Sequence, residues 1–274
     1  MLKQRVITGI VLIILVAAGI LLLPNELFAV LALVFMVGLG AWEWAGLTGC
    51  YMPNKRMAGT MMILIGSLPL IFLPLPATSV LGISVPIWAA LVIAVLIYPK
   101  PEGFYKHHRL MMRVLGIFVL VPAWYAVMTL HGIQGLPKPG AWYLLYLISL
   151  TAVADTSAYF TGRAFGKHKL APQLSPGKTW EGFFGAVVFG GLWALVSTYW
   201  LDIPSEQFIA FIALSKFTVV MSVFGDLFES LLKREAGVKD SGHILPGHGG
   251  ILDRIDSLLS AAPLFTLGML WLFA

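Results

Sequence analysis

The chain carries little charge. Only 11% of its 274 residues are Asp, Glu, Lys or Arg, whereas a soluble domain carries about 25% charged residues. Hydrophobic residues make up 59% of the chain. This shortage of charge excludes an ordinary water-soluble domain, because most of the surface must face something other than water. Apolar runs of roughly 20 residues, which are typical of membrane-spanning helices, recur along the sequence.

Cysteine is almost absent as well, since Cys50 is the single example. One cysteine excludes an intrachain disulfide, and the sequence has no Cys/His cluster with the spacing of zinc ligands. The net charge of +5 does not come from a basic soluble domain. Nucleic acid is therefore not an expected partner, whereas membrane lipids are expected partners.

The apolar runs predict an all-α polytopic membrane protein with about nine transmembrane helices. The first run is longer than the core of a typical signal peptide and no small-residue cleavage site follows it, so we interpret it as a span. Four prolines in segment 66–86 predict short or irregular helices in spans three and four. The predicted spans are 6–23, 27–47, 57–75, 80–98, 112–131, 142–161, 181–201, 207–229 and 252–273.

The basic residues alternate between loops. Lys and Arg are enriched in the cytoplasmic loops of membrane proteins. Of the 18 basic residues, 16 fall at the N-terminus or in loops 2–3, 4–5, 6–7 and 8–9, while Lys138 lies in loop 5–6 and Lys216 inside span eight. This pattern predicts a cytoplasmic N-terminus and an outer C-terminus in the inner (cytoplasmic) membrane.

We expect one integral membrane domain over residues 1–274. Residues 1–131 hold the five N-terminal spans. Residues 142–274 hold spans six to nine, whose cytoplasmic loops contain most of the unusual polar sequence. The chemistry is therefore expected in this second part, on the cytoplasmic side.

Carboxylates gather at the cytoplasmic ends of spans eight and nine. Asp226 and Glu229 are three residues apart and share a helix face with Lys233. Asp253 and Asp256 are also three residues apart, at the start of span nine. Oxygen ligands of this kind suit Mg²⁺ or Mn²⁺ when phosphate oxygens complete the coordination. The alternative is that these acids only form ion pairs with neighbouring basic residues.

Basic residues accompany the carboxylates. Lys233, Arg234, Lys239 and Arg254 are expected to take phosphate oxygens that a metal ion leaves free. Basic residues at a cytoplasmic helix end are also ordinary topological anchors, and for Lys233 and Arg234 both interpretations stay open.

A glycine-rich stretch leads into span nine. Gly249 and Gly250 allow backbone amides to form an anion-binding nest, and the start of the helix also favours an anion. His248 is expected to donate to a phosphate or to act as an acid or base. Orientation of Asp253 by His248 is the alternative.

The stretch Ser175–Thr179 has the sequence SPGKT and is similar to a phosphate-binding P-loop, but Pro172 stands where that motif requires glycine. Ser175, Lys178 and Thr179 remain candidates for phosphate contacts ahead of a helix. Thr179 is equally well explained as the N-cap of that helix. Asp155 lies within span six, where an ionisable residue is a functional candidate by default.

The run from Ser230 to Asp256 resembles the signature of the phosphatidate cytidylyltransferases, also called CDP-diacylglycerol synthases. The upstream sequences SPGKTWEG and GDLFES are also similar to this family. The resemblance is clearest over 155–256, whereas the first four spans share only hydrophobicity with it. The signature falls on Ser230, Lys233, Arg234, Lys239, Asp240, His248, Gly249, Gly250, Asp253, Arg254 and Asp256.

The resemblance implies a reaction of CTP with phosphatidic acid that gives CDP-diacylglycerol and pyrophosphate, with Mg²⁺, or alternatively Mn²⁺, as cofactor. It also suggests a homodimer. It implies Asp226 and Asp253 as metal ligands, supported by Glu229 and Asp256. The expected catalytic residues are Asp226, Lys233, Arg234, Lys239, Asp240, His248, Asp253, Arg254 and Asp256, and the expected substrate contacts are Ser175, Lys178, Thr179, Gly249 and Gly250.

Other functions are weighed against this one. A cytidylyltransferase for a different lipid phosphate would share the same architecture. A transporter would line an ion path with Asp155, Lys216 and Asp226, but it would then place charges at several mid-span positions. The pattern Asp-Gly-x-x-Ala-Arg of the CDP-alcohol phosphotransferases does not occur in the sequence.

Overall fold

The computed structural model describes residues 2–98, 108–244 and 249–273. Helices cover most of these residues, and the only strands among them form one short hairpin. A π-helical segment, Leu33–Leu39, joins α2 to α3, and a 3₁₀ turn, Ser205–Gln207, precedes α11. The other elements are α1 (Leu2–Leu22), α2 (Asn25–Ala32), α3 (Gly40–Leu47), α4 (Pro53–Phe72), α5 (Ala77–Gly82), α6 (Ser84–Leu96), α8 (Arg109–Gly132), α9 (Gly140–Phe165), β1 (Lys169–Ala171), β2 (Ser175–Thr179), α10 (Trp180–Trp200), α11 (Phe208–Ala236) and α12 (Leu252–Leu272).

Eight helical stretches of the described residues are long and apolar enough to cross a membrane. The chain is therefore an all-α integral membrane protein, which confirms the predicted class. Predicted spans two to nine each coincide with one of these stretches. The first predicted span falls on α1, whose described apolar part, Gly9–Leu22, is shorter.

Prolines separate the third span from the fourth, within the segment where the sequence predicts short or irregular helices. α4 contains Pro69 in its last turn and ends at Phe72, and Pro74 and Pro76 follow before α5 begins. Proline lacks the backbone N–H of a helix interior and disfavours helical geometry in the residue before it. The fourth span is then built from two helices that meet at Ile83.

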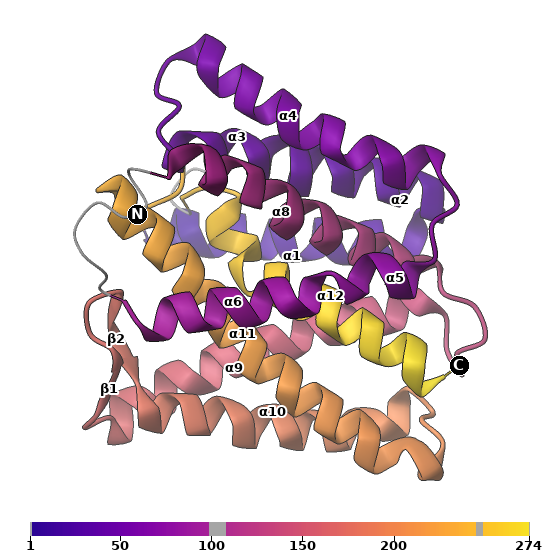
Figure 1. Cartoon of the computed structure of the whole chain (residues 1–274). Coiled ribbons are helices and arrows are strands. Elements are labelled where there is room, and N and C mark those ends of the chain that lie inside the picture. Colours follow the sequence, from indigo (N-terminus) through magenta and orange to yellow (C-terminus); the bar gives the residue numbers. More distant parts are fainter. Residues whose placement is uncertain (1, 99–107, 245–248, 274) are drawn as a thin grey trace.

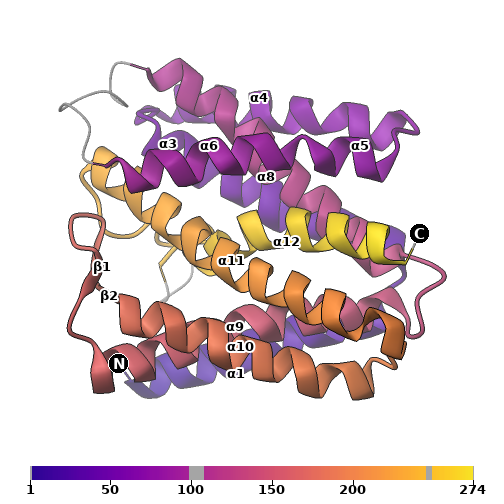
Figure 2. The ribbon, with the colours of Figure 1, turned by 60° about the horizontal axis from the view of Figure 1, so that its bottom comes forward.

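The two ends of the helix bundle differ in the elements that lie there. The start of α1 and the β1–β2 hairpin lie at one end, which we call the hairpin end, and α12 finishes at the other (Figures 1 and 2). α8 and α12 are the most buried of the candidate spans. Large apolar side chains such as Phe72 and Ile209 are exposed, as expected for a surface in contact with lipid.

Small residues bring α9 and α10 close together. A side chain at Gly182 would meet the carbonyl oxygen of Ala158, and one at Gly185 would clash with Thr161. Small residues at helix contacts are the usual means of close packing in membranes. This packing fixes the position of the hairpin, because the hairpin connects the end of α9 to the start of α10.

The hairpin itself was not predicted. β1 and β2 are antiparallel, with Lys169 opposite Thr179 and Ala171 opposite Ser175. The SPGKT sequence was expected to form a loop ahead of a helix, and it forms β2 instead. Nε of Arg234 donates to the carbonyl oxygen of Leu174 at 3.1 Å. This hydrogen bond holds the turn of the hairpin against the end of α11.

Candidate active site

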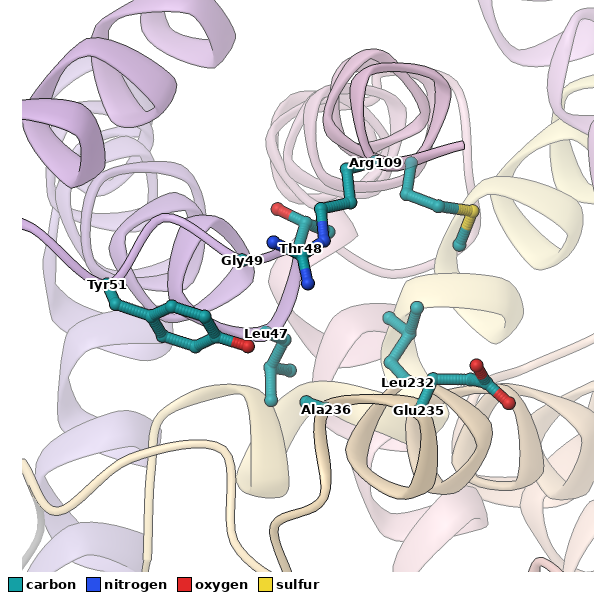
Figure 3. Close-up of a pocket in the computed structure, with 9 residues that line it drawn as sticks. Leu47, Thr48, Gly49, Tyr51, Arg109, Leu232, Glu235 and Ala236 are labelled. Atoms are coloured by element: carbon teal, nitrogen blue, oxygen red, sulfur yellow. The ribbon is translucent and has the colours of Figure 1, made fainter. Parts of the chain in front are cut away.

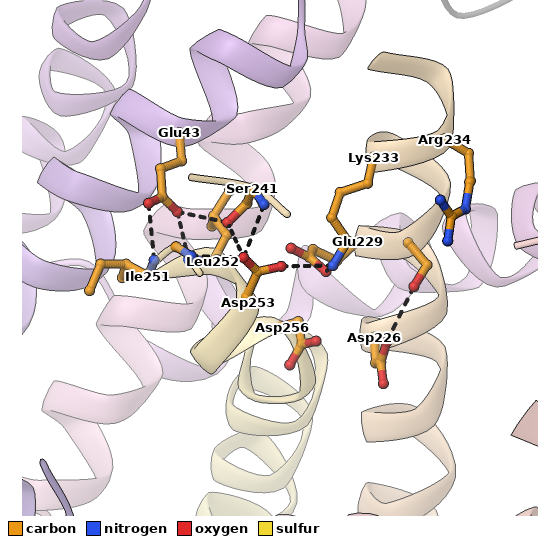
Figure 4. A network of polar contacts seen from close by, with 12 residues as sticks. Glu43, Asp226, Glu229, Lys233, Arg234, Ser241, Ile251, Leu252, Asp253 and Asp256 are labelled. Carbon is orange, nitrogen blue, oxygen red and sulfur yellow. Dashed lines mark hydrogen bonds and ion pairs between the residues drawn. The ribbon is translucent and has the colours of Figure 1, made fainter. Parts of the chain in front are cut away.

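Lys233 joins α11 to α12 through ion pairs at the hairpin end (Figure 4). Its Nζ lies 2.8 Å from Oδ1 of Asp253 and also pairs with the carboxylate of Glu229, one helical turn earlier. The Glu229 and Asp253 side chains are 2% and 8% exposed, and that of Lys233 is 14% exposed. One lysine therefore forms ion pairs with two nearly buried carboxylates.

The other oxygen of Asp253 is a hydrogen-bond acceptor for the loop before α12. Oδ2 accepts from the backbone N–H and from the hydroxyl of Ser241, both at 2.9 Å, and from the N–H of Gly250 at 2.8 Å. Together with Lys233, these donors hold the carboxylate of Asp253 in one orientation.

Glu43 reaches the same loop from α3. Its carboxylate is fully buried. Oε1 accepts from the backbone N–H of Ile251 at 3.0 Å, and Oε2 accepts from the N–H of Leu252 and the hydroxyl of Ser241, both at 2.9 Å. Figure 4 shows this carboxylate facing the first residues of α12. The N-terminal half of the chain therefore supplies a charged group to the network.

A second group of charged side chains surrounds Lys178 of β2. Its Nζ lies 2.7 Å from Oδ2 of Asp226 on α11, and the hydroxyl of Ser230 donates to Oδ1 of Asp226 at 3.4 Å. Asp155 on α9 and Asp256 on α12 both interact electrostatically with Asp226 and Lys178. Carboxylates from three helices thus lie near one lysine from the hairpin, and of these Asp226 forms the ion pair with it.

The donor chemistry of this second group suits a hard divalent cation. No three His, Cys, Asp or Glu side chains within the described ranges are arranged to hold a metal ion by themselves. Mg²⁺ is usually held by one or two carboxylates, with waters and substrate phosphates completing its octahedron. Asp226 and its carboxylate neighbours outnumber the one lysine beside them, so the residues present fit such an ion.

Comparison with known proteins shows to which family the chain belongs. The sequence profile of the cytidylyltransferase family matches residues 3–272 of the chain. The chain belongs to this family.

Individual relatives match over nearly the full length. A protein of Pseudomonas aeruginosa named phosphatidate cytidylyltransferase is 38% identical over 278 residues, which cover 99% of this chain and 97% of the relative. A protein of Haemophilus influenzae with the same name is 38% identical over 97% of this chain and 98% of its own. One from Bacillus subtilis, again with this name, is 44% identical over 53% of this chain and 55% of its own.

The two aspartates expected to hold a metal in this family member belong to different groups. Asp226 pairs with Lys178, whereas Asp253 is engaged by Lys233, Ser241 and Gly250. On α12 it is Asp256 that interacts electrostatically with Asp226. The division follows from the partners of each carboxylate, since Asp253 is held by Lys233, Ser241 and Gly250.

The glycines expected to bind phosphate lie directly before α12. The N–H of Gly250 donates to Asp253, and the next two amides donate to Glu43. Carboxylates of the protein thus accept from these three amides, and phosphate binding by Gly249 and Gly250 stays a prediction. Gly249 has a φ of +80°, where glycine is favoured. A Cβ at Gly250 would clash with the Glu43 carboxylate.

The remaining expected residues lie around these two groups. Thr179 accepts a hydrogen bond from the N–H of Gly182 at 3.1 Å, which confirms its N-cap role for α10. Arg234 binds the hairpin, and Ser175 lies in β2. His248 lies outside the described residues. Lys239 and Asp240 follow the end of α11, Arg254 lies in the first turn of α12, and all three are exposed.

Sequence reasoning missed Glu43 and Ser241. Glu43 lies within the second predicted span, 27–47, and the sequence indicates no partner for it, because the residues that it binds lie 198 to 209 positions later. The one available signal was the rule that a charged residue within a span is functional by default. Ser241 lies inside the signature run but is not one of the signature positions.

A pocket lies between the end of α3, the start of α8 and the end of α11 (Figure 3). Figure 3 shows Arg109 and Glu235 on opposite walls. The guanidinium of Arg109 packs over Gly49, where a Cβ would lie 2.9 Å from Nη1. The lining residues are Leu47, Thr48, Gly49, Tyr51, Arg109, Met112, Leu232, Glu235 and Ala236.

Proposed function

We propose that the chain transfers the cytidylyl group of CTP to phosphatidic acid, giving CDP-diacylglycerol and pyrophosphate in phospholipid biosynthesis. The names of the full-length relatives support this activity. The structural observation that carries the proposal is the convergence of two lysines with four aspartates, from the hairpin and three helices, at one end of a membrane protein. Such a site suits two phosphate-bearing substrates, one soluble and one embedded in lipid.

The reaction needs positioning more than acid–base chemistry. An anionic phosphate oxygen of phosphatidic acid attacks the α-phosphorus of CTP, and the bond from that phosphorus to the bridging oxygen of the β-phosphate breaks. Pyrophosphate leaves, and no proton has to be removed from the nucleophile. The barrier is the repulsion between two anions. Lys178 and Lys233, held by their aspartates, are placed to reduce this repulsion.

We infer that Mg²⁺, or alternatively Mn²⁺, assists the reaction. Asp226 and Asp253 are the expected ligands, and Asp256 adds a carboxylate beside Asp226. When bound, such an ion would neutralise oxygens of the substrate phosphates. Lys178 alone cannot balance Asp155, Asp226 and Asp256, and this excess of negative charge supports a cation there.

The hairpin end is proposed to face the cytoplasm from the inner membrane. CTP is soluble and must reach the site from water, whereas the acyl chains of phosphatidic acid stay in the bilayer. The basic residues of the predicted cytoplasmic loops include Lys178 and Lys233 of the site, which supports this orientation. A homodimer is proposed from the family resemblance.

The proposed activity is tested with purified protein, CTP and phosphatidic acid in detergent. We expect CDP-diacylglycerol and pyrophosphate in equal amounts with Mg²⁺, and no turnover after chelation until Mg²⁺ or Mn²⁺ is restored. The variant Asp253→Asn should lose activity, whereas Asp202→Asn, which changes an exposed aspartate paired with Lys138, should not. Absence of both products would contradict the proposal, and faster turnover of another lipid phosphate would reassign the lipid substrate.

A further inference from the structure

We propose that Glu43 is a positioning residue for this reaction, so the inference rests on the proposed function. Glu43 is the group from the N-terminal half of the chain that fixes the start of α12, and with it the orientation of Asp253. It does not have to touch either substrate to do so.

The first support is the number of donors that the Glu43 carboxylate satisfies. A buried charge within a membrane-spanning stretch is costly unless it is fully bonded. Both oxygens of Glu43 are used, by the N–H groups of Ile251 and Leu252 and by the hydroxyl of Ser241. A carboxylate with this many hydrogen-bond donors holds the residues around it in place.

The second support is that the N-cap residue of α12 does not cap the helix. Ile251 occupies the N-cap position and its side chain makes no capping hydrogen bond. The first amides of a helix lack partners within the helix, and the positive end of the helix dipole favours an anion. Glu43 supplies both the acceptor and the negative charge from α3. The start of α12 therefore depends on a residue 208 positions earlier.

The third support is the connection from Glu43 to Asp253. The hydroxyl of Ser241 lies 2.9 Å from Oε2 of Glu43 and 2.9 Å from Oδ2 of Asp253. One hydroxyl proton can be donated to only one of these carboxylates at a time, so the two acids are coupled through Ser241. Asp253 in turn holds Lys233. A change at Glu43 is thus transmitted to the lysine that is proposed to face phosphate.

The packing leaves no room for this carboxylate to move. A Cβ at Gly242 or at Gly250 would clash with Glu43, so both sides of the loop lie directly on its side chain. Glutamine has nearly the same shape but exchanges one acceptor oxygen for an NH₂ donor. In Glu43→Gln that donor would face N–H or O–H donors, and at least one hydrogen bond would be lost.

The test compares Glu43→Gln with the matched control Glu26→Gln, which changes an exposed glutamate in the same half of the chain. Hydrogen exchange of the Ile251 and Leu252 amides and the turnover number are measured for both. We expect faster exchange and a turnover number about 10–100-fold lower for Glu43→Gln, as for other residues that orient a functional group from behind. Glu26→Gln should match the parent in both.

Two further variants separate positioning from a purely structural role. If Glu43 acts through Asp253, Glu43→Gln should cost far less in the Asp253→Asn background than in the parent. Ser241→Ala keeps the cap on α12 but removes the link to Asp253, so it should lower turnover while leaving exchange at Leu252 unchanged. Ser241→Ala also tests the proposal if Glu43→Gln fails to fold.

The proposal would be overturned if Glu43→Gln kept the parental turnover number. It would also be overturned if the losses caused by Glu43→Gln and Asp253→Asn multiplied fully in the double variant. Unchanged amide exchange in Glu43→Gln would overturn it too. If the parent chain made no CDP-diacylglycerol, the proposed function would fail, whereas the exchange result would still decide whether Glu43 holds α12.

Discussion

Single residues decide how the charge of the site is balanced. Lys178 and Lys233 are each held by an aspartate and are 24% and 14% exposed. Ion pairs of this kind contribute little to stability, because desolvation of the two charges offsets their attraction. Their value lies in holding an ammonium group where an incoming phosphate can reach it. Loss of such a lysine leaves its carboxylates uncompensated, so it should reduce the stability as well as the rate.

Lys178→Met tests this expectation. The variant leaves Asp155, Asp226 and Asp256 without the lysine that lies near them, so their repulsion toward an anionic substrate rises. We expect kcat/KM for CTP to fall about 10²-fold or more, the range seen when one preorganised electrostatic donor is removed. The matched control is Lys138→Met, since Lys138 also pairs with an aspartate, Asp202, at 2.6 Å. Equal losses in the two variants would contradict a role for Lys178 in the site.

The sequence was informative about which residues carry charge and less so about which of them meet. Asp226, Lys233 and Asp253 were all expected in the site, because their i,i+3 and i,i+7 spacings can be read directly. The pairing of Lys178 with Asp226 was not predicted, since it joins separate elements. Glu43 shows the same limit more strongly. Its bonds to the Ile251 and Leu252 amides span 208 and 209 positions, so the spacing of residues could not predict them.

Among the elements, the hairpin depends most on its neighbours. Strands of three and five residues without alternating apolar positions give no recognisable pattern, so the sequence alone could not predict them. Their place is set by the close contact of α9 with α10 and by the hydrogen bond from Arg234. The hairpin ends at Thr179, which is also the cap of α10. A change at this cap should therefore affect Lys178, the residue before it.

Thr179→Ala and Thr179→Ser separate the cap from the packing. Alanine removes the oxygen that accepts the N–H of Gly182, whereas serine keeps it and removes only a methyl group. We expect Thr179→Ala to lower the free energy of unfolding by about 1 kcal/mol, and Thr179→Ser to lower it by less. Denaturant unfolding in mixed micelles measures both. If the two variants were equally stable, the capping hydrogen bond would contribute nothing.

The whole molecule is the level at which sequence reasoning succeeds best. Spans of about 20 apolar residues give a strong signal because the bilayer fixes their length. The exceptions are local, since the fourth span consists of two helices that meet at Ile83 and the described apolar part of α1 is short. A division into an N-terminal part and a catalytic part stays a prediction. Glu43 nevertheless shows that both parts contribute to one network.

Orientation in the membrane can be tested with single cysteines, because the chain contains only Cys50 and that side chain is buried. Gly242 is unsuitable for this purpose, since a side chain there would clash with Glu43. Gly177 in the hairpin has open space around it, and Gln134 is exposed in the loop between α8 and α9. In a Cys50→Ala background, Gly177→Cys and Gln134→Cys therefore report on the two ends of the bundle.

A membrane-impermeant maleimide should label Gln134→Cys in intact cells. It should label Gly177→Cys only after the membrane is opened, because the basic loops at the hairpin end are retained in the cytoplasm. The Cys50→Ala chain alone is the control for background labelling. Labelling of Gly177→Cys in intact cells would place the charged network outside. CTP could then not reach it from the cytoplasm, so the same result would also contradict the proposed reaction.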